Sequence, residues 1–310
     1  MKPSNYVIIA PCYNEEQNIE KFVNDIEVLL KKNNLICDIC LIDDGSTDNS
    51  WEIINNICKQ KKNIKAILLS KNFGKENAIE AGLESLNYNN YIILDADLQH
   101  PIEKIPSMIE NFENKKLEIL NTHRIDNKEG YLREFFSNLF YKFLNKFSDV
   151  NIITKTTDFM IISKKVRDTY IKINEKNKTF RILINWIGFK SLSIPIEINK
   201  RFQGNSKYSF LKLTKLALNT FSSFSIFPIK IISYFGVFVS LLSILLLVFI
   251  SLNYFIKFTI ITWQTYFIIT NLFFTGLSLC SIGLVGLYVS KINDNTNNRP
   301  NYIIEKKLDE

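Results

Sequence analysis

Two long stretches without a charged residue lie near the end of this 310-residue chain. The first runs from Ile231 to Ile256 and the second from Phe258 to Ser290, so that only Lys257 separates them. At ~1.5 Å rise per residue, a helix over the first stretch would reach roughly 39 Å, which is enough to cross a ~30 Å hydrocarbon core with some tilt. The alternative is a buried core helix, but such helices seldom run so long without a polar face. The sequence therefore predicts two membrane-spanning helices joined as a hairpin.

The charges around this hairpin predict its orientation. Basic residues precede the first stretch and follow the second, and they are Lys207, Lys212, Lys215, Lys230, Lys291, Arg299, Lys306 and Lys307. Both termini are therefore expected on the cytoplasmic side of the cell (inner) membrane. The chain enters a strand-like YVIIA directly after Asn5, without the pattern of a secretory signal, so we expect the hairpin itself to be the anchor. The net charge of +7 gathers near the hairpin without a basic stripe interleaved with aromatics, which favours lipid headgroups and argues against nucleic acid.

The cysteines indicate a reduced protein. Their number, five, is odd and does not suggest a disulfide framework. Cys37 and Cys40 have C-x-x-C spacing, but no second Cys/His pair completes a zinc site. We expect them to pack in the core.

Short apolar runs alternate with amphipathic stretches through the first part of the chain. The runs are VIIA, ICDICLI, IKAILLS, YIIL and LEILNT, and the predicted helices between them cover about 16–32, 48–59, 75–86 and 102–112. This alternation predicts an α/β fold with a parallel sheet covered by helices on both faces. Ligands of such sheets bind outside the carboxyl ends of the strands.

The segments that follow the predicted strands are unusually polar. They read PCYNEEQN, DDGSTDNS, KNFGKENA and DADLQHP. Helix capping by Ser46, Thr47 and Asp48, with Pro101 in a first helical turn, explains part of this polarity. It leaves Asp95 and Asp97 unexplained, because they lie several residues before the next helix.

Asp95 and Asp97 predict a cation site. In extended backbone, residues i and i+2 point to the same side, so the two carboxylates converge and would repel each other. Mg²⁺ or Mn²⁺ relieves that repulsion, and each typically takes one or two carboxylates together with water and phosphate oxygens. Neither G-x-G-x-x-G nor a Walker sequence is present, so a bound diphosphate would be met by metal and basic side chains.

At this point the motifs resemble a known family. APCYNEE, IDDGSTD, NFGKENAIEAG, DADLQHP and RFQGNSKYS, in this order, resemble the inverting glycosyltransferases of family 2. Within them they resemble the polyprenyl-phosphate glycosyltransferases related to dolichyl-phosphate mannose synthase, including the bactoprenol glucosyltransferase type. The resemblance implies a GT-A (Rossmann-like) fold, a nucleotide-sugar donor, a divalent metal and a lipid phosphate acceptor.

The resemblance also implies roles for particular residues. It places at the donor Pro11, Tyr13, Glu15, Ile42, Asp44, Asp95, Ala96, Asp97, Gln99, Arg124, Arg201 and Lys207. Asp95, Asp97 and Gln99 would hold the metal, and Arg124, Arg133 and Ser137 the acceptor phosphate. For Tyr13 and Ile42, plain packing at a strand end is the alternative. Arg133 and Ser137 would otherwise form a solvated helix face, and Arg201 and Lys207 would otherwise be juxtamembrane positive charges.

Asp158 in TTDFMII corresponds to an acidic residue on the acceptor side of related enzymes. Thr157 stands here for a glycine of that pattern and Met160 for an arginine. Asp158 is therefore expected to be catalytic either as a base or by binding a sugar hydroxyl. A phosphate monoester has a second pKa near ~6 and needs no strong base at neutral pH.

The sequence thus predicts an inverting, metal-dependent transferase with four parts. Residues 1–207 would form the cytoplasmic catalytic domain, 208–228 amphipathic interfacial helices, 229–291 the two spans and 292–310 a cytoplasmic tail. Gly276, Gly283 and Gly286 would allow close helix packing in a homo-oligomer, with the ordinary glycine usage of membrane helices as the alternative.

The reaction would move a sugar to undecaprenyl phosphate for cell envelope glycan biosynthesis. We expect UDP-glucose or a related UDP-sugar as the donor, with GDP-mannose as the alternative. A processive synthase is a poor match because Arg181 to Trp186 does not supply Q-x-x-R-W. A non-catalytic membrane scaffold stays as the alternative from another class.

Overall fold

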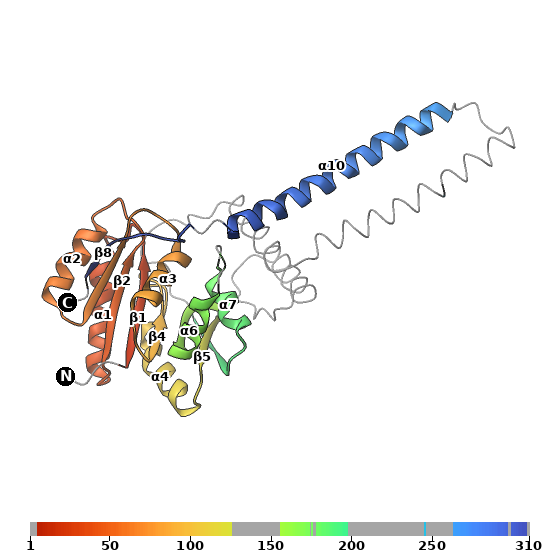
Figure 1. The fold of residues 1–310 in the computed structure, drawn as a ribbon. Coiled ribbons are helices and arrows are strands. Elements are labelled where there is room, and N and C mark those ends of the chain that lie inside the picture. The colour runs from red at the N-terminus through yellow and green to blue at the C-terminus, as the bar shows by residue number, and fades with distance from the viewer. Residues whose placement is uncertain are drawn as a thin grey trace. The chain divides into compact units, whose positions relative to one another are not determined.

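A computed structural model of the chain describes residues 5–125, 156–173, 175, 178–197, 245, 263–296 and 299–308 (Figure 1). The chain divides into two compact units. One contains Met1–Asn145, Val150–Lys207 and Arg299–Glu310, and the other contains Lys146–Asp149 and Tyr208–Asn298. Each unit is described separately.

The first unit is built on one mixed sheet. Its strands are β1 (Tyr6–Cys12), β2 (Cys37–Asp43), β3 (Ile64–Leu69), β4 (Asn90–Ile93), β5 (Ile119–Arg124), β6 (Thr156–Ser163), β7 (Ser191–Ile196) and β8 (Ile304–Leu308). Their order in space is β7-β5-β6-β4-β1-β2-β3-β8. All five strands expected from the apolar runs are present, and the pairs among β1, β2, β3 and β4 are parallel as predicted.

The parallel arrangement does not extend to two strands of the sheet, β6 and β8. β6 runs antiparallel to both β4 and β5, and β8 runs antiparallel to β3. The β8 segment was expected only as a tail, because its sequence IEKKL is too polar to read as a buried strand. It lies at the sheet edge, where charged residues are common.

Helices cover both faces of the sheet (Figure 1). They are α1 (Ile19–Lys32), α2 (Ser50–Gln60), α3 (Lys75–Ser85), α4 (Ile105–Asn114), α6 (Lys164–Lys172) and α7 (Phe180–Trp186), with the short 3-10 turn η1 (Ile102–Lys104) before α4. The bounds of α1, α2, α3 and α4 agree with the predicted helices to within a few residues, whereas α6 and α7 were not predicted. The α/β, GT-A-like arrangement of a parallel core with covering helices is therefore confirmed.

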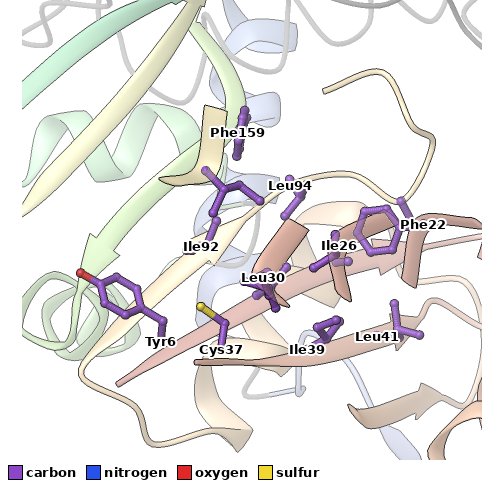
Figure 2. Close-up of a cluster of buried hydrophobic side chains, with 14 of the residues drawn as sticks. Tyr6, Phe22, Ile26, Leu30, Cys37, Ile39, Leu41, Ile92, Leu94 and Phe159 are labelled. Carbon is purple, nitrogen blue, oxygen red and sulfur yellow. The ribbon is translucent and has the colours of Figure 1, made fainter. Parts of the chain in front are cut away.

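Alternate residues of β1 face the two helical layers. Tyr6, Ile8 and Ala10 belong to a core cluster with Phe22 and Ile26 of α1 (Figure 2). The opposite face carries α3, which packs so closely that a Cβ on Gly82 would lie 3.0 Å from Cδ1 of Ile42 and 3.1 Å from Cγ2 of Ile9. Burial on both faces explains why these strands are apolar throughout.

The cysteines of the described residues are free and buried. Cys12, Cys37, Cys40 and Cys58 form no disulfide, and Cys37 is part of the cluster in Figure 2. Packing, as expected from the sequence, is the role that the structure assigns to the C-x-x-C pair.

The second unit contains α10 (Trp263–Thr296), which covers most of the second charge-free stretch. Among the described residues, no helix meets the length and apolarity needed to cross a membrane. The first charge-free stretch, apart from Leu245, and the predicted interfacial helices at 208–228 lie outside the described residues. The hairpin, the homo-oligomer and the division into four parts stay predictions.

Candidate active site

Several predicted site residues lie together at the carboxyl-terminal end of the parallel strands. Asp43 ends β2, and Asp95 follows β4 by two residues. β6 runs the other way, so its amino-terminal part lies at the same edge. In the β4–β6 register Ile93 pairs with Met160, and continuing it by two residues sets Asp95 beside Asp158.

Lys75, the first residue of α3, joins these two aspartates. Its Nζ lies 2.5 Å from Oδ1 of Asp95 and 2.5 Å from Oδ2 of Asp158. Arg181 of α7 approaches Asp158 from another direction, with its Nε 2.7 Å from Oδ1. His100 places its buried Nε2 3.4 Å from Oδ2 of Asp95. Asp95 and Asp158 thus share one ammonium, and each has a second nitrogen partner.

These contacts control the ionisation of the two carboxyl groups. Burial alone would raise the pKa of Asp95, but the charge of Lys75 and the hydrogen bond from His100 hold that pKa well below its usual range. Burial likewise opposes ionisation of Asp158, and Lys75 with Arg181 lowers its pKa. Burial would lower the pKa of Lys75, but the two aspartates raise it above its ordinary value. All three groups are charged at neutral pH.

Asp97 lies in a different electrostatic environment. Burial, and next the charge of Asp95, raise its pKa, so the site favours an added positive charge there. The backbone N–H of Gln99 donates to Oδ1 of Asp97 at 3.1 Å, in a turn where Leu98 has a φ of 60°. Ala96 between the aspartates is buried.

The donor set fits a hard divalent cation that also takes ligands from a substrate. Among the described residues, no group of three His, Cys, Asp or Glu side chains could hold a metal by itself. Asp95 and Asp97 with the amide oxygen of Gln99 offer hard oxygen donors, and Mg²⁺ or Mn²⁺ commonly completes such a set with water and phosphate oxygens. Asp95, Asp97 and Asp158 also outnumber the nearby permanent cations Lys75 and Arg181.

Asp44 holds the loop that precedes α3. Its Oδ1 accepts from the N–H of Phe73 at 2.8 Å and its Oδ2 from the N–H of Gly74 at 2.9 Å. Burial raises the pKa of Asp44 to about 6 although both hydrogen bonds favour the charged form. The structure thus gives this residue a loop-anchoring role, and its predicted contact with the donor stays a prediction.

The other predicted donor residues of the first two loops differ in their burial and contacts. Pro11 and Ile42 are buried in their strands, which is the packing role that the sequence left open for Ile42. Tyr13 is half-buried. Glu15 binds the start of α1, since its Oε2 accepts from Nδ2 of Asn18 at 2.5 Å. Their contacts with a nucleotide stay predictions.

Arg124 ends β5 and is exposed. β6 is antiparallel to both β4 and β5, so β4 and β5 run in the same direction. Arg124 therefore lies at the same end of the strands as Asp95. Arg133, Ser137, Arg201 and Lys207 lie outside the described residues. The predicted phosphate contacts of all five residues stay predictions.

Four residues of this site were missed by the sequence prediction, namely Lys75, Glu76, His100 and Arg181. Lys75 and His100 belong to polar segments that follow the third and fourth strands, so their positions were a usable signal. Glu76 accepts the N–H of Phe180 at 2.9 Å, and burial, next the charge of Asp158, raise its pKa to about 7. Arg181 had no local signal, because α7 reaches the site only through tertiary packing.

The family profile described as Glycosyl transferase family 2 matches residues 7–171, which contain β1 through β6 and the Asp95 and Asp158 cluster. The chain belongs to glycosyltransferase family 2. A relative in Bacillus subtilis, the uncharacterized glycosyltransferase YkcC, is 32% identical over 303 residues, 97% of this chain and 93% of its own. The bactoprenol glucosyl transferase derived from prophage SfII in Shigella flexneri is 30% identical over 299 residues, 96% of this chain and 97% of its own. The resemblance to the polyprenyl-phosphate branch of the family is therefore confirmed.

Among solved structures, the chain is similar to mannosyl-3-phosphoglycerate synthase from Rubrobacter xylanophilus. The TM-score is 0.49 at 14% identity, over 69% of this chain and 70% of that one.

Proposed function

We propose that this glycosyltransferase moves a sugar from a nucleotide-sugar donor to a polyprenyl phosphate at the cytoplasmic face of the membrane. The observation that carries the proposal is the extent of the similarity to the Shigella flexneri bactoprenol glucosyl transferase. It covers 96% of this chain, so it includes the two charge-free stretches as well as the family 2 domain. A lipid acceptor explains why one chain combines a nucleotide-sugar site with two apolar stretches long enough to cross a bilayer.

In the proposed reaction a phosphate oxygen of the acceptor forms a bond to the anomeric carbon of the donor. The bond from that carbon to the diphosphate oxygen breaks, the configuration inverts, and the nucleoside diphosphate leaves with the electron pair. A divalent cation held by Asp95, Asp97 and Gln99 would neutralise the diphosphate when bound.

The surroundings of Asp158 fit a residue that orients the acceptor better than they fit a general base. Lys75 and Arg181 lower its pKa, which makes it a weak proton acceptor. The acceptor phosphate is already largely ionised at neutral pH, since its second pKa is near ~6. The reaction therefore needs charge neutralisation and orientation more than it needs proton removal.

We propose UDP-glucose or a related UDP-sugar as the donor, because the name of the Shigella relative states glucosyl transfer. GDP-mannose is the second candidate. A panel of radiolabelled nucleotide sugars, incubated with the purified full chain, undecaprenyl phosphate and Mg²⁺ or Mn²⁺, would identify the donor. We expect lipid-linked label from one UDP-sugar and none from the Asp97→Ala variant.

No lipid-linked label from any donor would contradict the proposed transfer. If the protein also bound neither a nucleotide sugar nor Mn²⁺, the non-catalytic scaffold would become the better account. Label from GDP-mannose alone would keep the acceptor and correct the donor.

We also propose that the two charge-free stretches anchor the protein in the membrane with both termini cytoplasmic. The basic residues on the outer flanks of these stretches support this orientation. The protein should stay with membranes after a carbonate wash, and a reporter fused to either terminus should report the cytoplasm. Release by carbonate would overturn the anchor.

A further inference from the structure

Lys75 pairs with both Asp95 and Asp158. Asp95 is on the donor side of the proposed site, because it is one of the metal-site carboxylates. The family resemblance puts Asp158 on the acceptor side. One ammonium at 2.5 Å from each therefore connects the two halves of the reaction centre.

The position of Lys75 is fixed by the loop before it. Both oxygens of Asp44 hold the N–H groups of Phe73 and Gly74. Gly74 has a φ of 97°, which favours glycine. Gly45 allows the same loop to approach closely, since a Cβ there would lie 2.3 Å from the backbone carbon of Lys71. These constraints place Lys75 at the sheet edge before any ligand binds.

The charge of Lys75 lies where a divalent cation on Asp95 would repel it. Oδ1 of Asp95 is the atom that Lys75 contacts, and it belongs to the carboxylate that would ligate the metal. Two cations this close to one carboxylate compete for it, because their mutual repulsion offsets the attraction of each. Asp158 offers the ammonium a second partner that needs no large movement.

We propose that Lys75 is a positioning residue that competes with the divalent cation for Asp95 and, when the cation binds, stays with Asp158 on the acceptor side. In this arrangement Lys75 pairs with Asp95 before the cation binds. It then fixes Asp158 beside the acceptor when donor and cation are present. The inference rests on the proposed function for the location of the cation and for the acceptor-side role of Asp158.

Binding of Mn²⁺ alone, followed by electron paramagnetic resonance on the purified full chain at pH 8, tests the competition without donor or lipid. Lys75→Met removes the competing charge, so Mn²⁺ should bind roughly tenfold more tightly than to the wild type. The same variant should turn over at least about tenfold more slowly in the transfer assay, because Asp158 loses one of its two cation partners and keeps only Arg181. Tighter metal binding with slower turnover is a combination that a merely structural role would not produce.

Matched variants separate charge from packing. Lys75→Arg keeps the charge and should bind Mn²⁺ about as the wild type does. Lys61→Met makes the same substitution in a lysine whose Nζ lies 2.6 Å from Glu27, away from the site, and should leave Mn²⁺ binding unchanged. Asp158→Asn leaves Lys75 with Asp95 as its only partner of the two, so Lys75 competes more strongly with the metal. The variant also removes a negative charge near the metal site, which weakens cation binding as well. Mn²⁺ should therefore bind about threefold more weakly.

Equal or weaker Mn²⁺ binding by Lys75→Met, or the same gain in Lys75→Arg as in Lys75→Met, would overturn the inference. Binding by neither the wild type nor Lys75→Met would also overturn it. If Lys75→Met did not fold, Asp158→Asn would decide, and a dissociation constant at or below the wild-type value would count against the inference. None of these results depends on which sugar or lipid the enzyme uses, so failure of the proposed transfer would be seen separately.

Discussion

At the scale of single residues, the cations around Asp158 determine what this carboxylate can do. Lys75 and Arg181 both lie within ion-pair distance and lower its pKa. A carboxylate held in its charged form is a poor general base but a firm anchor for hydroxyl groups and for cations. The chemistry proposed here uses Asp158 for orientation.

Asp158→Asn should therefore slow turnover without abolishing donor binding. The amide keeps the size of the side chain but loses the charge that orders Lys75 and Arg181. We expect kcat to fall by about tenfold to a hundredfold, and donor affinity to change only a few-fold. Steady-state kinetics with a donor-binding titration would check this split, and unchanged turnover would remove Asp158 from the site.

Because the pKa of Glu76 is raised, the free energy of unfolding should depend on pH near neutrality. This pKa is raised from 4.5 to about 7, chiefly by burial and next by the charge of Asp158. The folded state therefore favours protonated Glu76, and this contribution to stability is fully present below about pH 4.5 and is lost as the pH rises through about 7.

Glu76→Gln should remove that loss, because the amide keeps an acceptor for the N–H of Phe180 without a charge. After screening by solvent we expect a gain of about 1 kcal/mol at pH 8, or about 2–4 °C in Tm. Melting curves of both proteins at pH 5 and pH 8 would show the difference only at pH 8. A difference of equal size at both pH values would contradict the assignment.

At the scale of elements, β8 is the least expected part of the sheet. It adds to β3 after α10 has ended, and the preceding residues bind α3. Nδ2 of Asn301 donates to Oε2 of Glu80 at 3.2 Å, and the hydroxyl of Tyr302 donates to Glu84. Segment 299–308 thus closes one edge of the sheet and fastens the helix that begins with Lys75.

Removal of residues 299–310 should lower Tm by roughly 5 °C or more, because β3 loses its ladder partner and α3 loses three side-chain hydrogen bonds from this segment. Removal of residues 309–310 alone keeps β8 and is the matched control, with no expected change. Thermal unfolding of the three proteins in the same detergent would measure the effect. Equal Tm values for both truncations would contradict a stabilising role for β8.

The elements that the sequence predicted correctly share a local signal. β1 to β5 are apolar runs buried on both faces, and α1, α2 and α4 have clear apolar stripes. β6 contains the buried apolar run Phe159–Ile162, but its antiparallel direction depends on a long connection; β8 lacked a local signal because its exposed residues are charged. Strand pairing between residues more than two hundred positions apart is a tertiary property that local patterning does not encode.

The same division holds within the site. Asp95, Asp97 and Asp158 could be found from their positions and from the family resemblance. The pairing of Asp95 with Asp158 through Lys75 could not, because it depends on the antiparallel register of β4 and β6 and on the loop that Asp44 holds. Arg181 reaches Asp158 only through the packing of α7.

At the scale of the whole molecule, the chain combines a family 2 domain with two charge-free stretches, and we propose that this combination serves a lipid acceptor. A soluble acceptor would not require the two charge-free stretches, whereas a polyprenyl phosphate is met at the bilayer surface. The lipid-linked sugar is therefore the product that distinguishes this function from transfer to a soluble acceptor.

The most direct test is transfer of labelled sugar into the organic phase by the purified full chain. With undecaprenyl phosphate, Mn²⁺ and the nucleotide sugar selected from the panel, wild type and Lys61→Met should form equal amounts of lipid-linked sugar. Asp97→Ala should form at least about a hundredfold less. Label that stays in the aqueous phase with the wild type, or lipid-linked label that persists in Asp97→Ala, would contradict the account.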